Sequence, residues 1–132
     1  MTIQEMKIGD SASTVKTIGE SDVYLFAGIT GDLNPAHTDE VSASQTPFGG
    51  RIAHGILSAG LISAVLGMRL PGPGTIYLGQ ELKFTKPVRF GDTVTATCTV
   101  SELLPEKNIA RLETICTNQD GDMVLSLIHI SE

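Results

Sequence analysis

The segment GILSAGLISAVLGM, residues 55–68, is apolar on nearly every side when it is drawn as a helix. Leucine, isoleucine and valine cover much of its circumference, and glycine, serine and alanine fill the rest. A surface helix keeps one polar face, so this pattern predicts a buried helix at about 54–69 that other structure wraps closely. The PGPG sequence at 71–74 ends it, and the run is too short to cross a membrane.

Before and after this segment in the sequence, apolar and polar residues alternate, as they do in half-buried β-strands. Expected strands lie at 10–19, 75–84, 92–104 and 109–118, with a further one after the turn at 118–122. Within 92–104, four threonines share one face and the other face carries Val94, Ala96, Cys98 and Val100. We therefore expect an α+β fold, in which a long antiparallel sheet wraps round one buried central helix.

The composition limits the partners of the chain. Its 132 residues are the size of one domain. Its net charge of −6 argues against nucleic acid, because proteins that bind nucleic acid usually present a basic face. The first residues contain no apolar run behind a basic start. We therefore expect a cytoplasmic protein that binds neither nucleic acid nor a membrane.

The two cysteines, Cys98 and Cys116, fall on the apolar side of expected strands. In that position a cysteine is usually a small buried hydrophobic residue, which suits a reducing compartment. A disulfide and a catalytic thiol are the alternatives.

Local signals also predict short helices before the apolar one. Residues 21–30 are expected to form a helix that Gly31 ends, and residues 37–45 a short helical turn. The expected caps are Ser21 or Asp22 for the first, and Thr38 or Asp39 for the second.

The sequence GDLNPAHTDE, residues 31–40, places an acid and a histidine at the two ends of a tight turn. Asp32 comes just past the expected helix, and Asn34-Pro35 turns the chain toward His37. Such a turn can be purely structural and held by an Asx hydrogen bond. It can also bring Asp32 and His37 to one point, where a carboxylate and an imidazole can move protons.

Three motifs in this order resemble the MaoC-like hot-dog hydratases: GDLNPAHTDE, FGGRIAHGILSAGLIS and GTIYLGQELKFTKPVRFGDTV. The resemblance is nearest to the short, single-domain (R)-specific enoyl-CoA hydratases, and it runs from about residue 6 to residue 124. It implies a hot-dog fold, a homodimer, and hydration of a trans-2-enoyl-CoA to an (R)-3-hydroxyacyl-CoA. It implies no metal and no cofactor, since coenzyme A is part of the substrate.

The resemblance also implies roles for three residues. Asp32 and His37 would hold and activate the water, and which of them is base or acid stays open. The N–H of Gly55, at the start of the apolar helix, would donate to the developing enolate oxygen. His54 is expected to anchor the loop before that helix, and catalysis by it is the less favoured alternative.

Further residues are candidates for contact with substrate. The residues expected to bind substrate are Asn34, Ser63, Leu57, Leu61 and Val65. Asn34 could instead hold the turn, and Ser63 could instead bond back to its own helix. A basic patch for the coenzyme A phosphates is expected among Arg51, Lys83, Lys86 and Arg89, whose alternative is to be solvated surface charges.

The end of the chain departs from the family pattern. Residues 125–132 read LSLIHISE, where such proteins close with a strand of alternating apolar residues. The string resembles the translation of a sequencing-library adapter. We therefore interpret residues 1–124 as a single hot-dog domain and residues 125–132 as a non-native tail that replaces the last strand. A divergent terminal strand is the alternative, and His129 is left out of the site.

Three other functions compete with hydration of enoyl-CoA. A dehydratase that acts on acyl carrier protein substrates would use the same chemistry in reverse. A hot-dog thioesterase would cut the C–S bond, but such enzymes typically lack the turn that joins Asp32 to His37. A non-catalytic acyl-CoA binding module could keep the groove without this pair.

Overall fold

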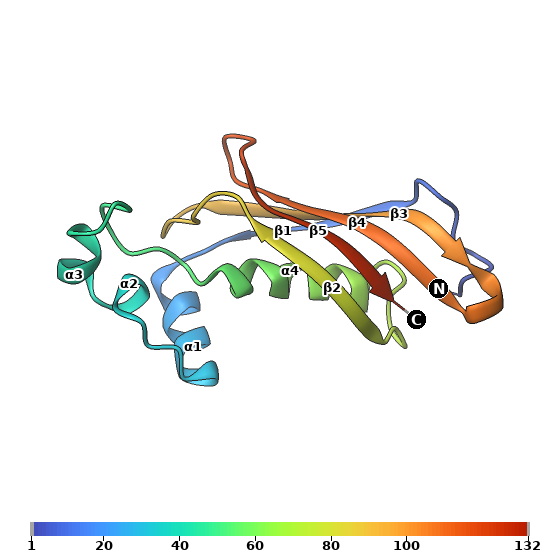
Figure 1. Cartoon of the computed structure of the whole chain (residues 1–132), viewed down its shortest axis with the longest axis horizontal. Coiled ribbons are helices and arrows are strands. Elements are labelled where there is room, and N and C mark those ends of the chain that lie inside the picture. Colours follow the sequence, from blue (N-terminus) through green and yellow to red (C-terminus); the bar gives the residue numbers. More distant parts are fainter. Residues whose placement is uncertain (1, 132) are drawn as a thin grey trace.

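The computed structural model describes residues 2–131, and for Tyr77 and residues 127–131 it describes the backbone alone. Its five strands form one antiparallel sheet in the order β1-β3-β4-β5-β2. The strands are β1 (Ser11–Thr17), β2 (Tyr77–Phe84), β3 (Thr93–Leu104), β4 (Ile109–Thr117) and β5 (Met123–Ser131). The helices are α1 (Glu20–Thr30), α2 (Pro35–Thr38), α3 (Glu40–Ser44), α4 (Gly55–Met68) and the 3-10 turn η1 (Pro105–Lys107). Figure 1 shows α4 running along one face of the sheet, with α1, α2 and α3 gathered at one end. This is the expected α+β hot-dog arrangement.

In β4 and most of β3, every second residue along the sequence is buried in the core. Every second residue of β3 from Val94 to Val100 is buried, and the threonines between them are half-buried. Strand β4 buries Ala110, Leu112, Thr114 and Cys116 in the same way. Cys98 pairs with Thr114 in the register of the two strands, so their buried faces coincide and form one apolar surface against α4.

Helix α4 is buried on one side only. Ile62, Val65 and Leu66 lie in the core with the apolar faces of β3 and β4. The opposite side exposes a stripe along the helix, made of Ile56, Gly60, Ser63, Ala64 and Met68. The expectation of a helix wrapped on all sides is therefore wrong for the single chain, because one sheet covers only one face of a helix.

Helix α1 begins earlier than expected and has a different cap. Gly19 is its N-cap, and the Gly19 N–H donates to the Asp22 carboxylate at 2.9 Å. Gly31 ends the helix as expected, in the left-handed conformation with φ at 81°. The turn expected at 37–45 divides into α2 and α3, and Asp39 caps α3.

Strand β5 is an inner strand of the sheet, between β4 and β2. Leu125 pairs with Cys116 on one side and with Phe84 on the other, and Val124 and Leu125 are buried. Residues 125–131 therefore occupy the place of the terminal strand. Their interpretation as a non-native tail stays a prediction, and residue 132 lies outside the described residues.

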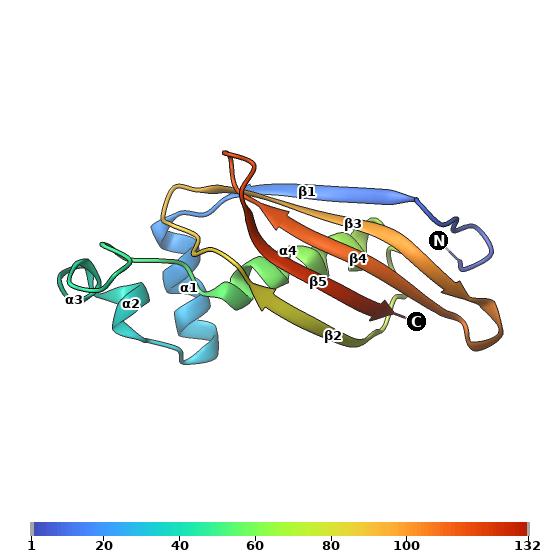
Figure 2. The same cartoon turned by 45° about the horizontal axis from the view of Figure 1, so that its top comes forward.

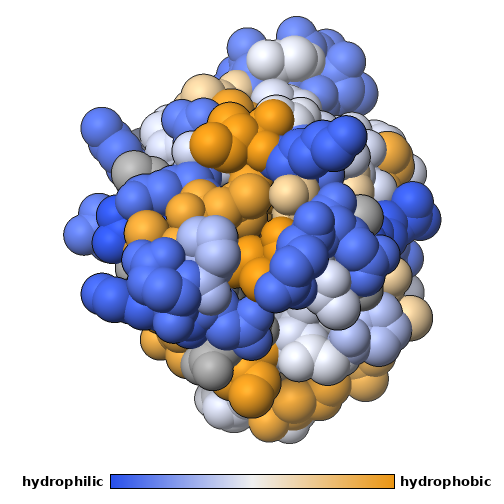
Figure 3. Space-filling model, turned by 90° about the vertical axis from the view of Figure 1, so that its right-hand side faces the viewer, coloured by the Kyte–Doolittle hydropathy of each residue, from blue (hydrophilic) through white to orange (hydrophobic). Residues whose placement is uncertain are grey.

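The two edges of the sheet are β1 and β2, which Figure 2 shows on opposite sides of the molecule. Ile76, directly before β2, and Leu78, within β2, are exposed apolar residues. Apolar atoms also gather between hydrophilic ones at the end of the molecule where β3 and β4 turn (Figure 3). Among residues 2–131, no helix combines the length and hydropathy that a membrane span requires.

Candidate active site

The turn between α1 and α2 is held by its own side chains. The Asp32 carboxylate accepts from the Asn34 N–H at 3.2 Å, and the Asn34 side-chain oxygen accepts from the Ala36 N–H at 3.0 Å. The Thr38 hydroxyl donates to the Leu33 carbonyl at 3.1 Å. The first two are Asx bonds of the kind that a structural turn makes, and of the Asp32 carboxylate they use only Oδ1. Asn34 is the N-cap of α2, which agrees with the interpretation that it holds the turn, and its contact with substrate stays a prediction.

His37 lies half-buried on α2, with one ring nitrogen already committed. Its Nδ1 is 2.7 Å from the carbonyl oxygen of Ile52. A carbonyl oxygen can only accept a hydrogen bond, so Nδ1 carries the proton and donates it. Nε2 therefore presents its lone pair, which is the form in which an imidazole can take a proton from water.

Asp32 and His37 lie close enough together for one water molecule to bridge them. Polar atoms of Asp32, His37 and His54 all lie within 4.8 Å of one another. Two hydrogen bonds of about 2.8 Å that meet at one water oxygen span roughly 4.6 Å. The fold thus brings the acid and the histidine together, within about the span of one bridging water.

His54, the N-cap of α4, is the third member of this cluster and is only 3% exposed. Its Nε2 lies 2.9 Å from the main-chain oxygen of Asp32 and 3.9 Å from Oδ2 of the same residue. Its ring lies against that of His37, with centroids 3.9 Å apart, and against that of Phe26, with centroids 4.7 Å apart. These contacts agree with the expected role as an anchor of the loop before α4.

The same three residues are the candidate metal ligands among the described residues. A metal ion needs a nitrogen lone pair from each histidine. His54 Nε2 uses its proton on the Asp32 carbonyl, so its lone pair is not presented to the cluster. The donor set therefore fits a bridging water better than a metal ion.

Helix α4 begins at Gly55 beside this cluster, and the side chain of its N-cap residue, His54, makes no capping hydrogen bond. The first N–H groups of a helix have no partner within it, and the helix dipole makes this end favourable for negative charge. The Phe84 ring lies directly against Gly55, where a Cβ would come within 2.6 Å of the ring. Glycine therefore leaves room for both the ring and an approaching carbonyl oxygen.

A largely apolar groove of about 430 Å³ leads to this point. Its walls come from the loop before α4, the first turn of α4 and the residues that follow β2, and include Phe48, Ile52, Ile56, Ser58, Phe84, Lys86 and Val88. A smaller pocket of about 240 Å³ includes Phe26, Thr30, Asp32 and His54. The groove and the pocket share His37, Gly55 and Ile56, so a ligand in the groove would meet the acid–histidine pair and the start of α4 together.

The residues of α4 that were expected to contact substrate do not line this groove. Val65 is fully buried in the core, and Leu57 and Leu61 pack against the core. Ser63 is exposed on the opposite stripe of α4, and the serine that lines the groove is Ser58. These four expectations are wrong for the groove of the single chain, because α4 turns about 100° per residue and only its first turn borders the groove.

Sequence reasoning missed Ile56 and Phe84, which are both about half exposed in the groove, at 52% and 51%. Ile56 could have been found as the large residue next to Gly55. No sequence signal marks Phe84, because only the folded sheet brings the end of β2 to the start of α4.

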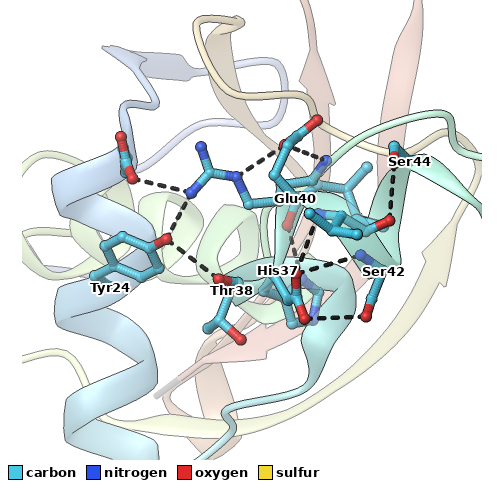
Figure 4. Close-up of polar contacts among 12 residues, drawn as sticks. Tyr24, His37, Thr38, Glu40, Ser42 and Ser44 are labelled. Carbon is cyan, nitrogen blue, oxygen red and sulfur yellow. Dashed lines mark hydrogen bonds and ion pairs between the residues drawn. The ribbon is translucent and has the colours of Figure 1, made fainter.

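Arg51 joins α1 to α3 through Glu20 and Glu40 instead of standing free for a phosphate, and Figure 4 shows two of its partners, Tyr24 and Glu40. Its guanidinium donates to Glu20 and to Glu40 at 2.9 Å each, and to the Tyr24 hydroxyl at 2.5 Å. It also lies over the Phe90 ring, 4.6 Å from the centroid. The hydrogen bond with Glu20 raises the pKa of Arg51 well above its ordinary value. Arg51 therefore positions the helices that carry the acid–histidine turn.

Of the expected basic patch, only Lys86 lines the groove within the part of the chain that the structure describes. Its ammonium pairs with the Asp122 carboxylate at 2.6 Å, and this hydrogen bond raises the pKa of Lys86. Both side chains are about half exposed, so the pair is open to exchange with a competing anion. Lys83 and Arg89 do not border the groove.

The two cysteines are buried and unbridged. Burial raises the pKa of Cys98 and of Cys116 to about 12. A thiol with such a pKa is almost never ionised near neutral pH, and only the thiolate is a good nucleophile. The interpretation of both as small buried residues is confirmed.

Comparison with known proteins places the chain among related sequences and structures. A family model described as "MaoC like domain" matches residues 4–120. The (R)-specific enoyl-CoA hydratase of Rhodospirillum rubrum is 62% identical, over 86% of this chain and 79% of that protein. The 3-hydroxybutyryl-CoA dehydratase of Methylorubrum extorquens is 52% identical, over 92% of this chain and 76% of that protein. The solved structure of the (R)-hydratase from A. caviae involved in PHA biosynthesis superposes with a TM-score of 0.95 at 40% identity, covering 98% of both chains.

Proposed function

This chain belongs to the MaoC-like domain family, and we propose that it is an enzyme that adds water to a trans-2-enoyl-CoA to form the (R)-3-hydroxyacyl-CoA. The reaction is a hydro-lyase reaction and runs in both directions. The observation that carries this proposal is the junction of groove and pocket, where the close pair of Asp32 and His37 meets the N-terminus of α4 at Gly55.

The water sits between the Asp32 carboxylate and Nε2 of His37 and donates one hydrogen to each. Its oxygen bonds to C3 of the enoyl group as one O–H bond breaks, and the pair takes up that proton. The pair then returns a proton to C2. Water is thereby added across the double bond with no net change in the protonation of Asp32 and His37.

The thioester oxygen carries negative charge between these two proton transfers. At the junction it accepts a hydrogen bond from the Gly55 N–H, aided by the positive end of the α4 dipole. A donor of this kind typically contributes about 3–4 kcal/mol to transition-state stabilisation. These groups supply acid–base and oxyanion chemistry, so the reaction as proposed uses no metal and no cofactor beyond the coenzyme A of its substrate.

The shape of the groove supports a thioester substrate with an apolar portion. Ile52, Ile56 and Val88 give it apolar walls, and Lys86 supplies its positive charge. A carrier with phosphate groups, such as coenzyme A, fits a cation at this place.

We extend the proposal to the assembly of the chain. Strand β2 is an edge of the sheet and has exposed apolar residues on it and next to it, and such edges are usually covered. The exposed stripe of α4 is also apolar or small, with Ile56 and Met68 at 52% and 72% exposure. A homodimer that joins the two sheets along β2 would cover both features. Size-exclusion chromatography with light scattering tests this, and a monomer would contradict it.

The function itself is tested with crotonyl-CoA. We expect the absorbance of the enoyl thioester to fall without release of free thiol, and chiral analysis to give the (R) alcohol. Thiol release with an intact double bond would instead indicate a thioesterase, and binding without turnover would indicate a non-catalytic module. Faster turnover of the matching acyl carrier protein thioester would favour the dehydratase of that carrier.

A further inference from the structure

His54 contacts both members of the acid–histidine pair and precedes the oxyanion donor in the chain. Its Nε2 is 2.9 Å from the main-chain oxygen of Asp32, 22 residues away in sequence. Its ring lies against the ring of His37, with an angle of 30° between the planes. Its own backbone is the N-cap of α4, directly before Gly55. One side chain thus links three segments that each bring one functional group.

The hydrogen-bond pattern of His54 does not suit proton transfer. The Asp32 carbonyl can only accept, so the His54 proton is on Nε2 and is committed to that bond. Nδ1 is buried and finds no hydrogen-bond partner in the part of the chain that the structure describes. Neither nitrogen is therefore arranged to exchange a proton with a water at Asp32 and His37.

Asp32 needs support of this kind. It follows the end of α1 at Gly31 and its side chain is 51% exposed. The Asn34 N–H orients one carboxylate oxygen, but the bond from His54 is what joins the Asp32 main chain to the start of α4. A catalytic group must be held to within about 0.5 Å of its productive place, and an exposed loop does not achieve this alone.

We propose that His54 is a positioning residue for hydration, which sets Asp32 against His37 and Gly55 through its Nε2–H bond to the Asp32 carbonyl. The proposal rests on the hydratase function above. It gives His54 no contact with substrate and no part in proton transfer.

The test uses two substitutions that differ in which nitrogen they mimic. A glutamine side chain can place its amide N–H near the position of Nε2, whereas the shorter asparagine mimics Nδ1. With crotonyl-CoA, His54→Asn should lower kcat at least about 10-fold, because a misplacement near 1 Å can cost about 100-fold. KM should stay within about twofold, and His54→Gln should recover most of kcat.

A double-mutant comparison separates positioning from general support of the fold. If His54 acts through Asp32, His54→Asn should cost little further activity in a protein that already carries Asp32→Asn. If the effects of His54→Asn and Asp32→Asn on kcat were fully additive, the proposal would be overturned. Wild-type kcat in His54→Asn, or an equal loss of kcat in His54→Asn and His54→Gln, would overturn it as well. An inactive wild-type protein would instead refute the hydratase function.

A measurement on the unmodified protein covers the case in which His54→Asn does not fold. In protein labelled with ¹⁵N-histidine, the His54 ring should show a proton on Nε2 and none on Nδ1, with slow exchange of the Nε2 proton. A proton on Nδ1, or rapid exchange at Nε2, would mean that the bond to Asp32 is absent and would overturn the proposal whatever the activity.

Discussion

The ring of Phe84 lies so close to Gly55 that a Cβ at position 55 would come within 2.6 Å of its Cε1 and 2.7 Å of its Cδ1. Phe84 is half exposed in the groove, so an added methyl group would push the ring aside. Gly55→Ala should therefore lower kcat/KM for crotonyl-CoA by about 10- to 100-fold, because the displaced ring enters the path of the thioester oxygen.

The matched control for this steric argument is the double variant Gly55→Ala with Phe84→Ala. Removal of the ring frees the space that the new methyl group needs, so steady-state kinetics should show partial recovery of kcat/KM. A double variant as slow as Gly55→Ala alone would show that the defect at position 55 does not come from contact with Phe84.

Substitution of the acid–histidine pair should affect turnover more than binding. Asp32→Asn keeps the shape of the side chain and removes its charge, and His37→Gln removes the proton carrier. Each should lower kcat by about 100-fold or more, the usual contribution of a general acid or base. KM should change little if both residues act mainly in the transition state. Near wild-type kcat in either variant would remove that residue from the mechanism.

Features close together in sequence were predicted better than features that the fold assembles. Gly31 as a helix end and the turn from Asp32 to His37 depend on neighbouring residues, and both were predicted. The bond from His54 to the Asp32 carbonyl depends on how α4 packs, and no local pattern reports it. The function was expected from the resemblance, because spacing alone favoured a purely structural turn.

The errors along α4 have one physical cause. The sequence shows which positions of a helix are apolar, but not which stripe faces the sheet and which faces the groove. Val65 was expected at the substrate and is in the core, and Ser63 is on the exposed stripe. Arg51 was expected near phosphate because its charge is visible in sequence, whereas its partners Glu20 and Glu40 are found only in the fold.

The ion pairs of Arg51 predict a pH-dependent contribution to stability. Its hydrogen bond lowers the pKa of Glu20 from the ordinary value of 4.5. A lowered pKa in the folded state means stabilisation that is present above the unfolded value and is lost as pH falls through the folded one. Arg51→Met should thus lower Tm. The difference in Tm between variant and wild type should stay constant from about pH 8 to about pH 5 and narrow below that.

Thermal melts across this range, followed by circular dichroism, measure the gap between the two proteins. Glu113→Gln is a suitable control, because Glu113 is an exposed acid on β4 away from this network. A gap that stays constant down to about pH 3 would show that Arg51 stabilises the fold through packing on Phe90 and not through its carboxylate partners.

The two thiols should not react while the protein is folded. With a pKa of about 12 for Cys98 and Cys116, only ~10⁻⁴ of each is thiolate at pH 8 even before burial limits access. A thiol reagent such as DTNB should give almost no colour with native protein and two equivalents in guanidinium chloride. Rapid reaction of one thiol in the native state, without loss of the fold, would contradict the burial of both.

The tail lies in β5, an inner strand of the sheet, so its sequence affects the stability of the fold. It pairs with β4 on one side and is the neighbour of β2 in the sheet on the other, so a poorly packed β5 weakens both contacts. A buried hydrogen bond left unmade costs about 1–3 kcal/mol, and a whole domain has only about 5–15 kcal/mol of stability. We interpret residues 125–132 as non-native, and so expect a native closing strand in their place to stabilise the sheet more.

Exchange of residues 125–132 for a strand of alternating apolar and polar residues, with an apolar residue kept at position 125, should therefore raise Tm and reduce aggregation. The control is a strand of the same composition in scrambled order, which removes the alternation that places apolar side chains on the α4 side of the sheet. Differential scanning calorimetry and size-exclusion chromatography compare the three proteins. Because β5 pairs with both β4 and β2, a native strand in its place should stabilise all three strands together. Equal Tm and the same oligomer in the original and exchanged proteins would contradict the interpretation of the tail as non-native.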